Sequence, residues 1–457
     1  MHDVIIIGAG FAGLAAARHL QQAGIDNFRL LEARNRVGGR TQHGTIAGID
    51  IDIGGMWLGP TQTRLKALAE GYQVSTYKTP LKGKAVYRIS GNHMESEGED
   101  FSSIFNLREG LNYMMVQRRL GKLWSTLDIE QPWNHPQADT LDATKVEQWI
   151  CANMKSERLR QTFRMICFSL FCAEASQISM LFFLHYVKSG DNFDAILSAG
   201  EGGAQNMLFE GGVHQVARKM AEEIGDRLML NQPVREIAWS DQGVTVTSDS
   251  ETYQAKRAII AIPPTMVSDL TFSPELPQPK KALHARLSMG SAIKYWVAYE
   301  TPFWRDQGYN GLIFRDDVPC SPCFDVTPAS SSKGLIAGFF DGDHALNHGD
   351  NDRESRKARV LNMLADHYGE QALHPIEYVD KDWTSATWSR GCYGAYAPPG
   401  VYSRYGEWLR KPIGALNWAG TETSPRWTGY IDGAIRSGEA AAQDILPALE
   451  KERMVAS

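Results

Sequence analysis

The hydrophobic pattern near the start of the chain predicts a strand, a glycine-rich turn and a helix over residues 3–23. A second apolar run, Phe28–Leu31, ends in the carboxylate of Glu32. Strand, helix and strand in this order predict a βαβ unit with parallel strands. Residues 34–60, which are rich in Gly and Arg, are expected to form a long connection.

From about residue 79 to 205 the pattern changes to amphipathic segments rich in Trp, Met and Phe, which predict a helical region. Within it, residues 178–187 are strongly apolar but too short and interrupted to span a bilayer, so we expect a buried helix. Other apolar and β-branched runs predict further elements. These are helices at 61–71, 213–224 and 352–368, and strands at 72–77, 227–230, 234–239, 243–247, 257–262, 292–299, 311–315 and 335–340.

The 457 residues are too many for one simple core, so we predict an α/β protein of two interleaved domains. A Rossmann-like nucleotide domain is expected to comprise residues 1–78, 206–270 and 388–457. A substrate domain with a mixed sheet and helices is expected to comprise residues 79–205 and 271–387.

Composition limits the kinds of partner. With 43% hydrophobic and 22% charged residues the chain is typical of a globular protein, and the net charge of −6 gives no reason to expect nucleic acid or anionic lipid. Six cysteines do not suggest a disulfide framework, and Cys320-Ser-Pro-Cys323 lacks a second pair for zinc, so we expect two loop thiols and no metal. The first strand begins too early for a signal peptide and the tail after Leu446 is short and charged, so we expect a cytoplasmic protein without a membrane anchor.

Gly8, Gly10 and Gly13 form the pattern G-x-G-x-x-G directly after the first strand. The first glycine allows the tight turn, the second lets backbone approach a pyrophosphate, and the third lets helix and strand pack closely. Glu32 has the spacing of a carboxylate that accepts from ribose hydroxyls. A tight turn in a core is the alternative for the glycines alone, but strand, helix and carboxylate in register predict a dinucleotide site.

The stretch Glu32-Ala33-Arg34-Asn35-Arg36-Val37-Gly38-Gly39-Arg40 resembles the flavin-containing amine oxidase family, whose members carry E-A-R-x-R-x-G-G-R here. The resemblance implies FAD, with Arg40 at its pyrophosphate; the alternative for Arg40 is a solvated surface charge. Asp52–Gln62 continues the resemblance, which implies that Gly55 and Met56 lie under the flavin and Trp57 near the substrate.

Residues 388–400 (Trp-Ser-Arg-Gly-Cys-Tyr-Gly-Ala-Tyr-Ala-Pro-Pro-Gly) are similar to the monoamine oxidase stretch G-G-C-Y-x-x-Y-x-P-P-G. In those enzymes the cysteine sulfur is joined to the flavin 8α-methyl group, which implies an 8α-S-cysteinyl FAD on Cys392. Arg390 departs from the family by replacing the first glycine, which puts the local turn in doubt. An inert buried thiol is the alternative for Cys392.

Residues 419–430, with a helix expected from Ile431, resemble the second flavin-binding motif of the same family. A helix N-terminus there can stabilise negative charge on a reduced flavin. The resemblance implies that Tyr393 and Tyr430 form two aromatic walls that align an amine before the flavin. A tyrosine taken alone is more often a core residue.

Lys294 lies in the strand expected at 292–299, where alternation places it on a face with Ala292, Trp296 and Ala298. A charge among apolar neighbours is costly without a partner. An edge strand would let the lysine reach solvent. The resemblance implies instead that Lys294 contacts flavin N5 through a water.

Other positions follow only from the resemblance. It implies that Trp57, Leu197, Gln205 and Phe324 line a substrate channel and that Val234 meets the adenine. The remaining cofactor-binding residues that it implies are Ala33, Arg34, Gly39, Trp383, Gly420, Thr421, Glu422, Tyr430 and Ile431.

Together these observations predict a two-domain FAD-dependent oxidoreductase that oxidises a primary or secondary amine to an imine, with oxygen as acceptor and aldehyde, ammonia and hydrogen peroxide as products. The alternatives are a carbon–carbon desaturase of the same fold and a catalytically silent FAD-binding scaffold. The expected partners are a small amine and oxygen. The sequence does not identify the amine, and a homodimer is one oligomeric state that it leaves open.

Overall fold

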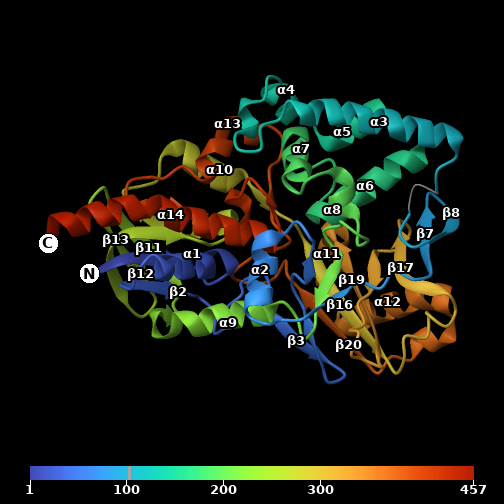
Figure 1. The fold of residues 1–457 in the computed structure, drawn as a ribbon. Coiled ribbons are helices and arrows are strands. Elements are labelled where there is room, and N and C mark those ends of the chain that lie inside the picture. The colour runs from blue at the N-terminus through green and yellow to red at the C-terminus, as the bar shows by residue number, and fades with distance from the viewer. Residues whose placement is uncertain (101–103, 457) are drawn as a thin grey trace.

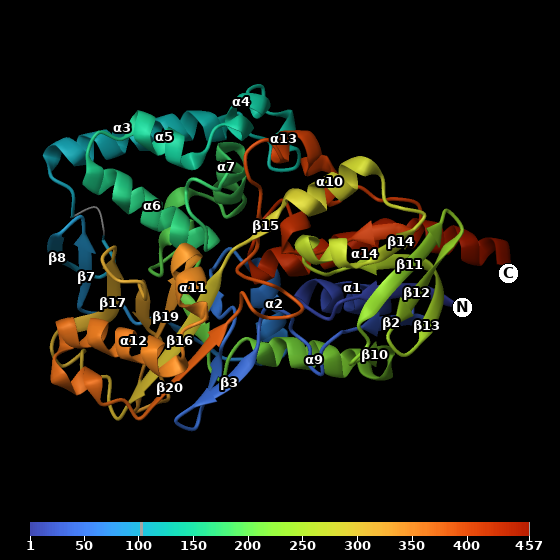
Figure 2. The same ribbon diagram turned by 180° about the vertical axis from the view of Figure 1, so that it is seen from behind.

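The structure, a computed structural model, describes residues 1–100 and 104–456. Figure 1 shows one sheet with its helices beside both chain ends, a second sheet on the opposite side, and a layer of helices above the second sheet. Figure 2 gives the same arrangement from behind. The predicted α/β fold class, with a Rossmann-like strand, glycine turn and helix, is confirmed by this architecture.

The first sheet has a parallel centre. β1 lies between β2 and β13, and both neighbours run parallel to it. Residues 3–7 of β1 are all buried, as expected for a strand covered on both faces. The strand order is β10 (Leu228–Met229), β2 (Phe28–Leu31), β1 (His2–Ile7), β13 (Thr252–Ile260), β12 (Gly243–Ser248), β11 (Val234–Ser240) and β14 (Thr271–Ser273), with β22 (Leu416–Trp418) also paired to β13.

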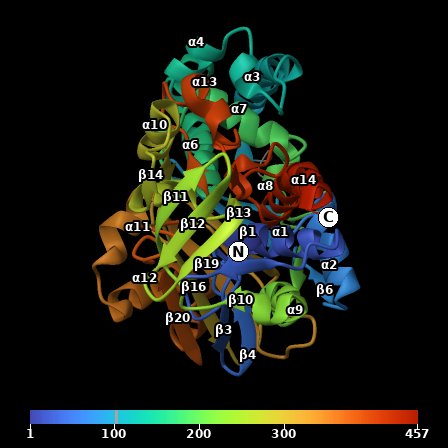
Figure 3. The ribbon, with the colours of Figure 1, turned by 90° about the vertical axis from the view of Figure 1, so that its left-hand side faces the viewer.

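Three helices pack together on one face of this sheet. α1 (Phe11–Gln22) contacts both α14 (Ile431–Ala456) and α9 (His214–Ile224), and Figure 3 shows them along one side of the strands. Their apolar side chains form one cluster with Val4, Ile6 and Ile259. The predicted βαβ unit is therefore confirmed, and the first and last long helices lie side by side.

The second sheet has mixed strand directions, and both of its faces are buried at its centre. All eight residues of β16 are buried, with Ile293, Tyr295 and Val297 in one apolar cluster and Trp296 and Ala298 in another. The predicted alternation is therefore confirmed. The strand order is β20 (Glu377–Asp382), β16 (Ala292–Tyr299), β19 (Gly334–Asp341), β18 (Cys323–Asp325), β17 (Tyr309–Arg315), β7 (Lys84–Ile89) and β8 (Asn92–Glu97), with α12 (Arg353–Tyr368) packed on the first of these clusters.

Helices cover the second sheet from above, as Figure 1 shows. Their centre is the helix predicted around residues 178–187, in which nine of ten residues are buried. The layer comprises α3 (Leu107–Ser125), α4 (Ala138–Ala143), α5 (Val146–Asn153), α6 (Glu157–Phe171), α7 (Met180–Ser189) and α8 (Phe193–Leu197). Other elements are α2 (Thr63–Gly71), β3 (His43–Ile46), β4 (Ile49–Asp52), β5 (Trp57–Leu58), β6 (Thr76–Lys78), β9 (Met207–Phe209), α10 (Gln278–Arg286), β15 (Ser288–Met289), α11 (Gly342–Gly349), β21 (Ala395–Tyr396) and α13 (Tyr402–Tyr405).

Three expectations were wrong. The helical region predicted for 79–205 begins with a hairpin, because β7 and β8 pair across Ser90-Gly91, both at positive φ (51° and 75°), as in a tight two-residue turn. The strand predicted at 72–77 begins only at Thr76, since a turn at residues 72–73 follows α2. Cys320 and Cys323 are buried, and Cys323 lies within β18 rather than in a loop.

The domain limits remain a proposal, and residues 101–103 of the expected substrate domain lie outside the described part. β14 pairs with β11 in the first sheet, so we propose a boundary after Ser273 rather than after residue 270. None of the described helices combines the length and apolar character needed to cross a bilayer. Within residues 1–100 and 104–456 we find no cluster of three or more His, Cys, Asp or Glu side chains that could hold a metal.

Candidate active site

The glycines of the turn between β1 and α1 have different surroundings. Gly8 has φ +100°, and a Cβ there would lie 2.7 Å from the Ala261 carbonyl oxygen. A Cβ on Gly13 would lie 1.8 Å from the Gly8 oxygen, so helix and strand touch at this glycine. At Gly10 the nearest atom would be Gly39 Cα at 3.9 Å. The space left there, over the N-terminus of α1, suits the phosphates of a dinucleotide.

Glu32 ends β2, and its buried carboxylate is partly engaged by the chain itself. Oε2 accepts from the Ala9 N–H at 2.8 Å, and Oε1 accepts from the Arg34 N–H at 3.0 Å. The Arg34 guanidinium lies 3.4 Å from Oε1. A carboxylate offers about four acceptor positions, so lone pairs remain for ribose hydroxyls.

Arg40 and Glu422 form an ion pair across the site. Arg40 donates to the two Glu422 oxygens at 2.6 and 3.1 Å and to the Tyr393 carbonyl at 2.9 Å. Glu422 also accepts from the Ala395 N–H at 3.0 Å. Burial opposes ionisation, but the pair with Arg40 holds the pKa of Glu422 below its ordinary value. Arg40 is therefore no solvated surface charge: it ties the connection after β2 to two segments near the other end of the chain.

Lys294 lies on β16, inside the second sheet between β20 and β19, so the edge-strand alternative is wrong. Its ammonium donates to the carbonyls of Asp52 and Gly54, both at 2.8 Å, and to Met56 Sδ at 2.9 Å. The side chain is 2% exposed. Burial lowers the pKa of Lys294 to about 7, against the opposing effect of Asp52. This lysine can therefore change its charge near neutral pH.

Cys392 lies in the loop before β21 and is 7% exposed. Its N–H donates to the Gly290 carbonyl at 3.0 Å. Burial and, next, Asp341 raise the pKa of the Cys392 thiol to about 12, while Arg40 and Lys294 oppose the shift. Arg390 adopts φ +49° and pairs with Asp269 at 2.7 Å, so the turn forms although Arg390 stands in place of a glycine.

A buried acid, Asp341, lies behind Cys392 at the end of β19. It faces Ala292 in the strand register and has the Cys172 thiol beside it. Among the residues that the structure describes, neither oxygen of its carboxylate finds a hydrogen-bond partner. Burial raises the pKa of Asp341 well above its ordinary value, with the Cys172 thiol acting in the opposite direction. Burial thus favours a protonated, neutral Asp341.

Two cavities meet at Tyr393 and Tyr430. The first, which we call the cofactor cavity, runs from the glycine turn to Cys392, and the second, the substrate cavity, lies between the second sheet and the helices α6 to α8. Each tyrosine ring contacts another aromatic ring. The ring centres of Tyr393 and Phe339 lie 5.7 Å apart, and those of Tyr430 and Tyr186 lie 5.9 Å apart. Burial raises the pKa of Tyr430 to about 12, so its hydroxyl stays neutral. An elongated molecule entering from the substrate cavity must pass these rings.

Most of the expected site residues line these cavities, but Gly13 and Glu422 lie behind the walls. The cofactor cavity is lined by Gly8, Gly10, Glu32, Ala33, Arg34, Gly39, Arg40, Gly55, Val234, Lys294, Trp383, Cys392, Tyr393, Gly420, Thr421, Tyr430 and Ile431. The substrate cavity is lined by Gly55, Met56, Trp57, Leu197, Gln205, Phe324, Tyr393, Tyr430 and Ile431.

Several lining residues were missed from the sequence. Phe339 lines both cavities, and Tyr186, Ile166 and Leu312 line the substrate cavity. Each is an ordinary apolar or aromatic residue of a helix or strand, and no local motif marks it. Only the packing of α6 and α7 against β17 and β19 brings these side chains together.

The residues present fit a flavin dinucleotide. Open space at Gly10, lone pairs on Glu32 and the helix N-terminus of α1 serve the nucleotide end. At the other end of the cofactor cavity lie Lys294, Cys392 and the start of α14. When bound, FAD would supply a two-electron acceptor at the point where the two cavities meet.

The chain matches the family model described as flavin containing amine oxidoreductase over residues 11–446. It is 34% identical over 450 residues to the probable flavin-containing monoamine oxidase A of Dictyostelium discoideum, covering 97% of each chain. It is 36% identical to the L-amino acid dehydrogenase of a Synechocystis species, covering 97% of this chain and 94% of the other. The solved structure of cyclohexylamine oxidase from Brevibacterium oxydans superposes with a TM-score of 0.92 at 32% identity, over 98% of this chain and 99% of that one.

The protein is an FAD-dependent enzyme of two-domain fold. It belongs to the family of flavin-containing amine oxidases, and its resemblance to monoamine oxidase is confirmed over nearly the whole chain.

Proposed function

We propose that the protein oxidises a primary or secondary amine to an imine and reduces oxygen to hydrogen peroxide, the imine then hydrolysing to aldehyde and ammonia. The observation that carries the proposal is the junction of the two cavities, where Tyr393 and Tyr430 line both. When bound, FAD would supply the acceptor for a hydride from the carbon next to the amine nitrogen. The chain supplies alignment and exclusion of water.

The two tyrosines are proposed to hold the amine between their faces. Tyr393 contacts the Phe339 ring and Tyr430 contacts the Tyr186 ring, so other aromatic side chains help to hold the two rings in place. Lys294 is proposed to hold a water toward the flavin. Its contact with the soft sulfur of Met56 is the one that a water would replace, since the carbonyls of Asp52 and Gly54 are stronger acceptors.

Cys392 is proposed to carry the FAD through a thioether to the flavin 8α carbon. Support comes from its place in the wall of the cofactor cavity, beside Tyr393. Arg34, Trp383 and Val234 are proposed to line the remaining length of FAD.

The substrate cavity favours an amine over an amino acid. Among the described residues that line it, Glu99 is the only charged one, and no Arg, Lys or His is present to meet a carboxylate. Glu99 accepts from Ala199 and Gly200 N–H groups at 2.7 and 2.8 Å. A substrate carboxylate buried in this cavity without a cationic partner would cost binding free energy. We therefore propose a substrate with an apolar body and no acid group, unlike the substrate named for the Synechocystis relative.

A panel of amines with peroxide release and oxygen consumption as readouts tests the proposal. Phenethylamine and L-phenylalanine differ only by the carboxylate. We expect phenethylamine to have a kcat/KM at least about tenfold higher than L-phenylalanine, because the carboxylate of the amino acid would be buried without a cationic partner. Preference for the amino acid would overturn the substrate class. Failure of every amine to release peroxide would favour the desaturase or the silent scaffold.

A further inference from the structure

A third cavity of about 330 Å³ opens beside the cofactor cavity and is lined by three cations. Arg34 and Arg36 come from the connection after β2, and Lys381 comes from β20. Among the described residues that line it there is no carboxylate. Arg34, Trp383 and Trp388 also line the cofactor cavity, so the two spaces share a wall. We call this third space the cationic cavity.

The positive charge of the cationic cavity is poorly compensated. In the part of the chain that the structure describes, neither Arg36 nor Lys381 forms an ion pair, whereas Arg34 lies 3.4 Å from Glu32. The two terminal nitrogens of Arg36 donate to four neutral acceptors. These are the Val37 and Gly39 carbonyls, both at 3.1 Å, and the Thr41 carbonyl and Gln42 Oε1, both at 3.0 Å. Two charges therefore share one space without a matching anion.

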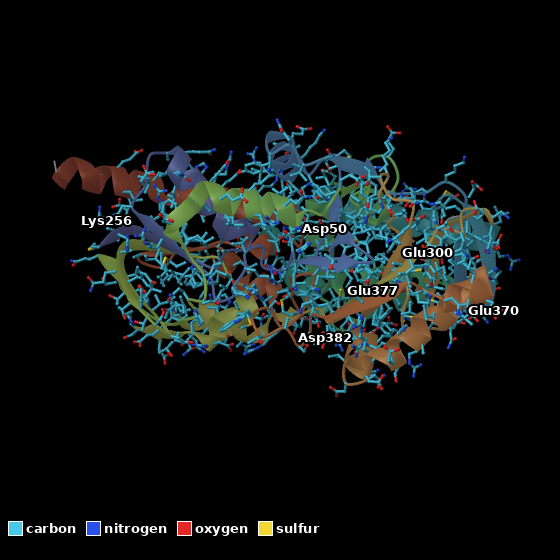
Figure 4. All side chains as sticks on the ribbon, turned by 90° about the horizontal axis from the view of Figure 1, so that it is seen from below. Asp50, Lys256, Glu300, Glu370, Glu377 and Asp382 are labelled. Carbon is cyan, nitrogen blue, oxygen red and sulfur yellow. The ribbon has the colours of Figure 1, made fainter. Side chains whose placement is uncertain are left out.

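Among the residues that the structure describes, the Lys381 ammonium has no hydrogen-bond acceptor or ion-pair partner. Its ammonium lies 5.3 Å from the centre of the Trp383 ring. Figure 4 labels the next residue, Asp382, and so locates this end of β20. The Asp382 carboxylate accepts from the Thr384 and Ser385 N–H groups at 2.8 and 3.3 Å, and it opposes the fall in the pKa of Lys381 without forming an ion pair with it in the described structure. Burial, and then repulsion from Arg36 and Arg34, lower the pKa of Lys381.

We propose that the cationic cavity binds an organic phosphate, with the phosphate group between Arg36 and Lys381. A phosphate dianion matches two cations that have no ion-pair partner. The Lys381 ammonium can donate to its oxygens, and Arg36 adds its charge and its Nε–H, since its terminal N–H groups are already engaged. Ser385, Thr387 and Gln42 add neutral hydrogen-bonding groups to the wall. The volume exceeds that of a bare phosphate and reaches the lower end of the range for small-molecule sites, about 300 Å³. The half-buried Trp388 offers an aromatic surface for the organic part.

The site would communicate with the flavin. Lys381 lies directly opposite Lys294 in the pairing of β20 with β16, so a bound anion would lie one strand away from the lysine that faces the cofactor. Trp383 connects both cavities and donates its indole N–H to the Ile53 carbonyl at 2.8 Å. The ligand would therefore adjust the cofactor end of the enzyme without entering the substrate cavity.

The test is a calorimetric titration of the flavin-loaded protein with inorganic phosphate, pyrophosphate and AMP, and with adenosine as the uncharged counterpart of AMP. We expect saturable binding of AMP and none of adenosine. Lys381→Met should weaken AMP binding by about tenfold or more, as for the loss of one charge-assisted contact, and Lys381→Arg should restore it. Lys411→Met is the matched control, since Lys411 also lies beside a tryptophan, Trp408, at 4.4 Å, outside the cationic cavity.

Two results would overturn the proposal. One is the absence of binding for all three phosphate compounds, which would mean that bound FAD already satisfies these cations. The other is equal affinity in wild type and Lys381→Met. If that variant is poorly folded by circular dichroism, Lys381→Gln provides the same comparison. Both results are independent of amine oxidation, because binding heat is measured without substrate.

Discussion

Lys294 is a buried base whose charge state changes near neutral pH. Replacing it by Met keeps the length of the side chain but removes the group proposed to hold a water, so we expect Lys294→Met to retain FAD and lose about 100-fold or more in turnover. Because burial lowers the pKa of Lys294 to about 7, the charged form prevails below that pH and the neutral amine above it. The wild-type kcat/KM profile should show a limb near that pH that the variant lacks.

Stopped-flow reduction and reoxidation of the flavin, together with pH profiles for amines of different basicity, check this prediction. A limb that moves with the pKa of the amine belongs to the substrate rather than to Lys294. Turnover close to wild type would remove Lys294 from the reaction and leave it as a clamp on the carbonyls of Asp52 and Gly54.

The Cys392 sulfur decides how the cofactor is held. We expect acid-precipitated wild-type protein to stay yellow and a tryptic peptide containing Cys392 to carry the FAD mass. Cys392→Ala should release the flavin on denaturation and keep part of its activity, since electron transfer does not use the sulfur. Cys151→Ala, at an exposed cysteine, is the matched control and should leave the flavin bound. A colourless pellet from wild type would make Cys392 an ordinary buried thiol.

Asp341 should lower the stability of the folded protein as the pH rises. Its folded pKa is raised above the unfolded value of about 3.9, because burial disfavours the charged form. Its favourable contribution is therefore complete below the unfolded pKa and is lost as the pH rises through the folded pKa. Asp341→Asn, which cannot ionise, should be more stable than wild type at alkaline pH and similar at acidic pH. Denaturant unfolding across pH measures this difference, and a difference that grows toward acid would contradict it.

Tyr393 and Tyr430, which we call the aromatic cage, come from two segments, the loop before β21 and the N-terminal end of α14. Tyr393→Ala or Tyr430→Ala should widen the space between the two side chains and lower kcat/KM by about tenfold or more. The reason is that the amine is no longer aligned in the transition state. The matching Phe variants should be milder, because the ring face forms the wall. Steady-state kinetics with one amine measures the series, and Ala variants as active as wild type would refute the cage.

Elements with regular patterns could be predicted from the sequence, and those that depend on partners could not. The two apolar faces of β16 follow from its alternation, and α7 follows from its continuous apolar run. The pairing of β7 with β17 could not be foreseen, since it joins strands that are far apart in the chain. Likewise, nothing local to Arg40 reveals that its carboxylate partner stands 382 positions later.

The Arg40–Glu422 pair joins two segments that lie 382 positions apart in the chain, so its loss should affect global stability. Glu422→Gln would leave Arg40 without its buried partner, which typically costs about 3–5 kcal/mol. Since Arg40 holds the folded pKa of Glu422 below its ordinary value, this stability is present above the unfolded pKa and is lost as the pH falls through the folded pKa. The variant should therefore unfold more readily at neutral pH and differ less from wild type in acid.

Thermal and denaturant unfolding, with flavin retention as a second readout, measure this effect. Asp249→Asn is the matched control. Asp249 accepts two hydrogen bonds from Arg235, at 2.7 and 2.9 Å, but this ion pair is exposed and should contribute little to stability. Equal loss in both variants would show that the buried pair has no special role.

The walls of the cofactor cavity combine residues that the ribosome makes early with residues that it makes much later. Gly8 and Gly10 are synthesised long before Cys392, Tyr430 and Ile431, and all of them line the same space. A growing chain can offer the nucleotide half of the site early but cannot close the flavin half until α14 has begun. Both halves of the cofactor cavity can therefore be in place only after translation has passed the start of α14.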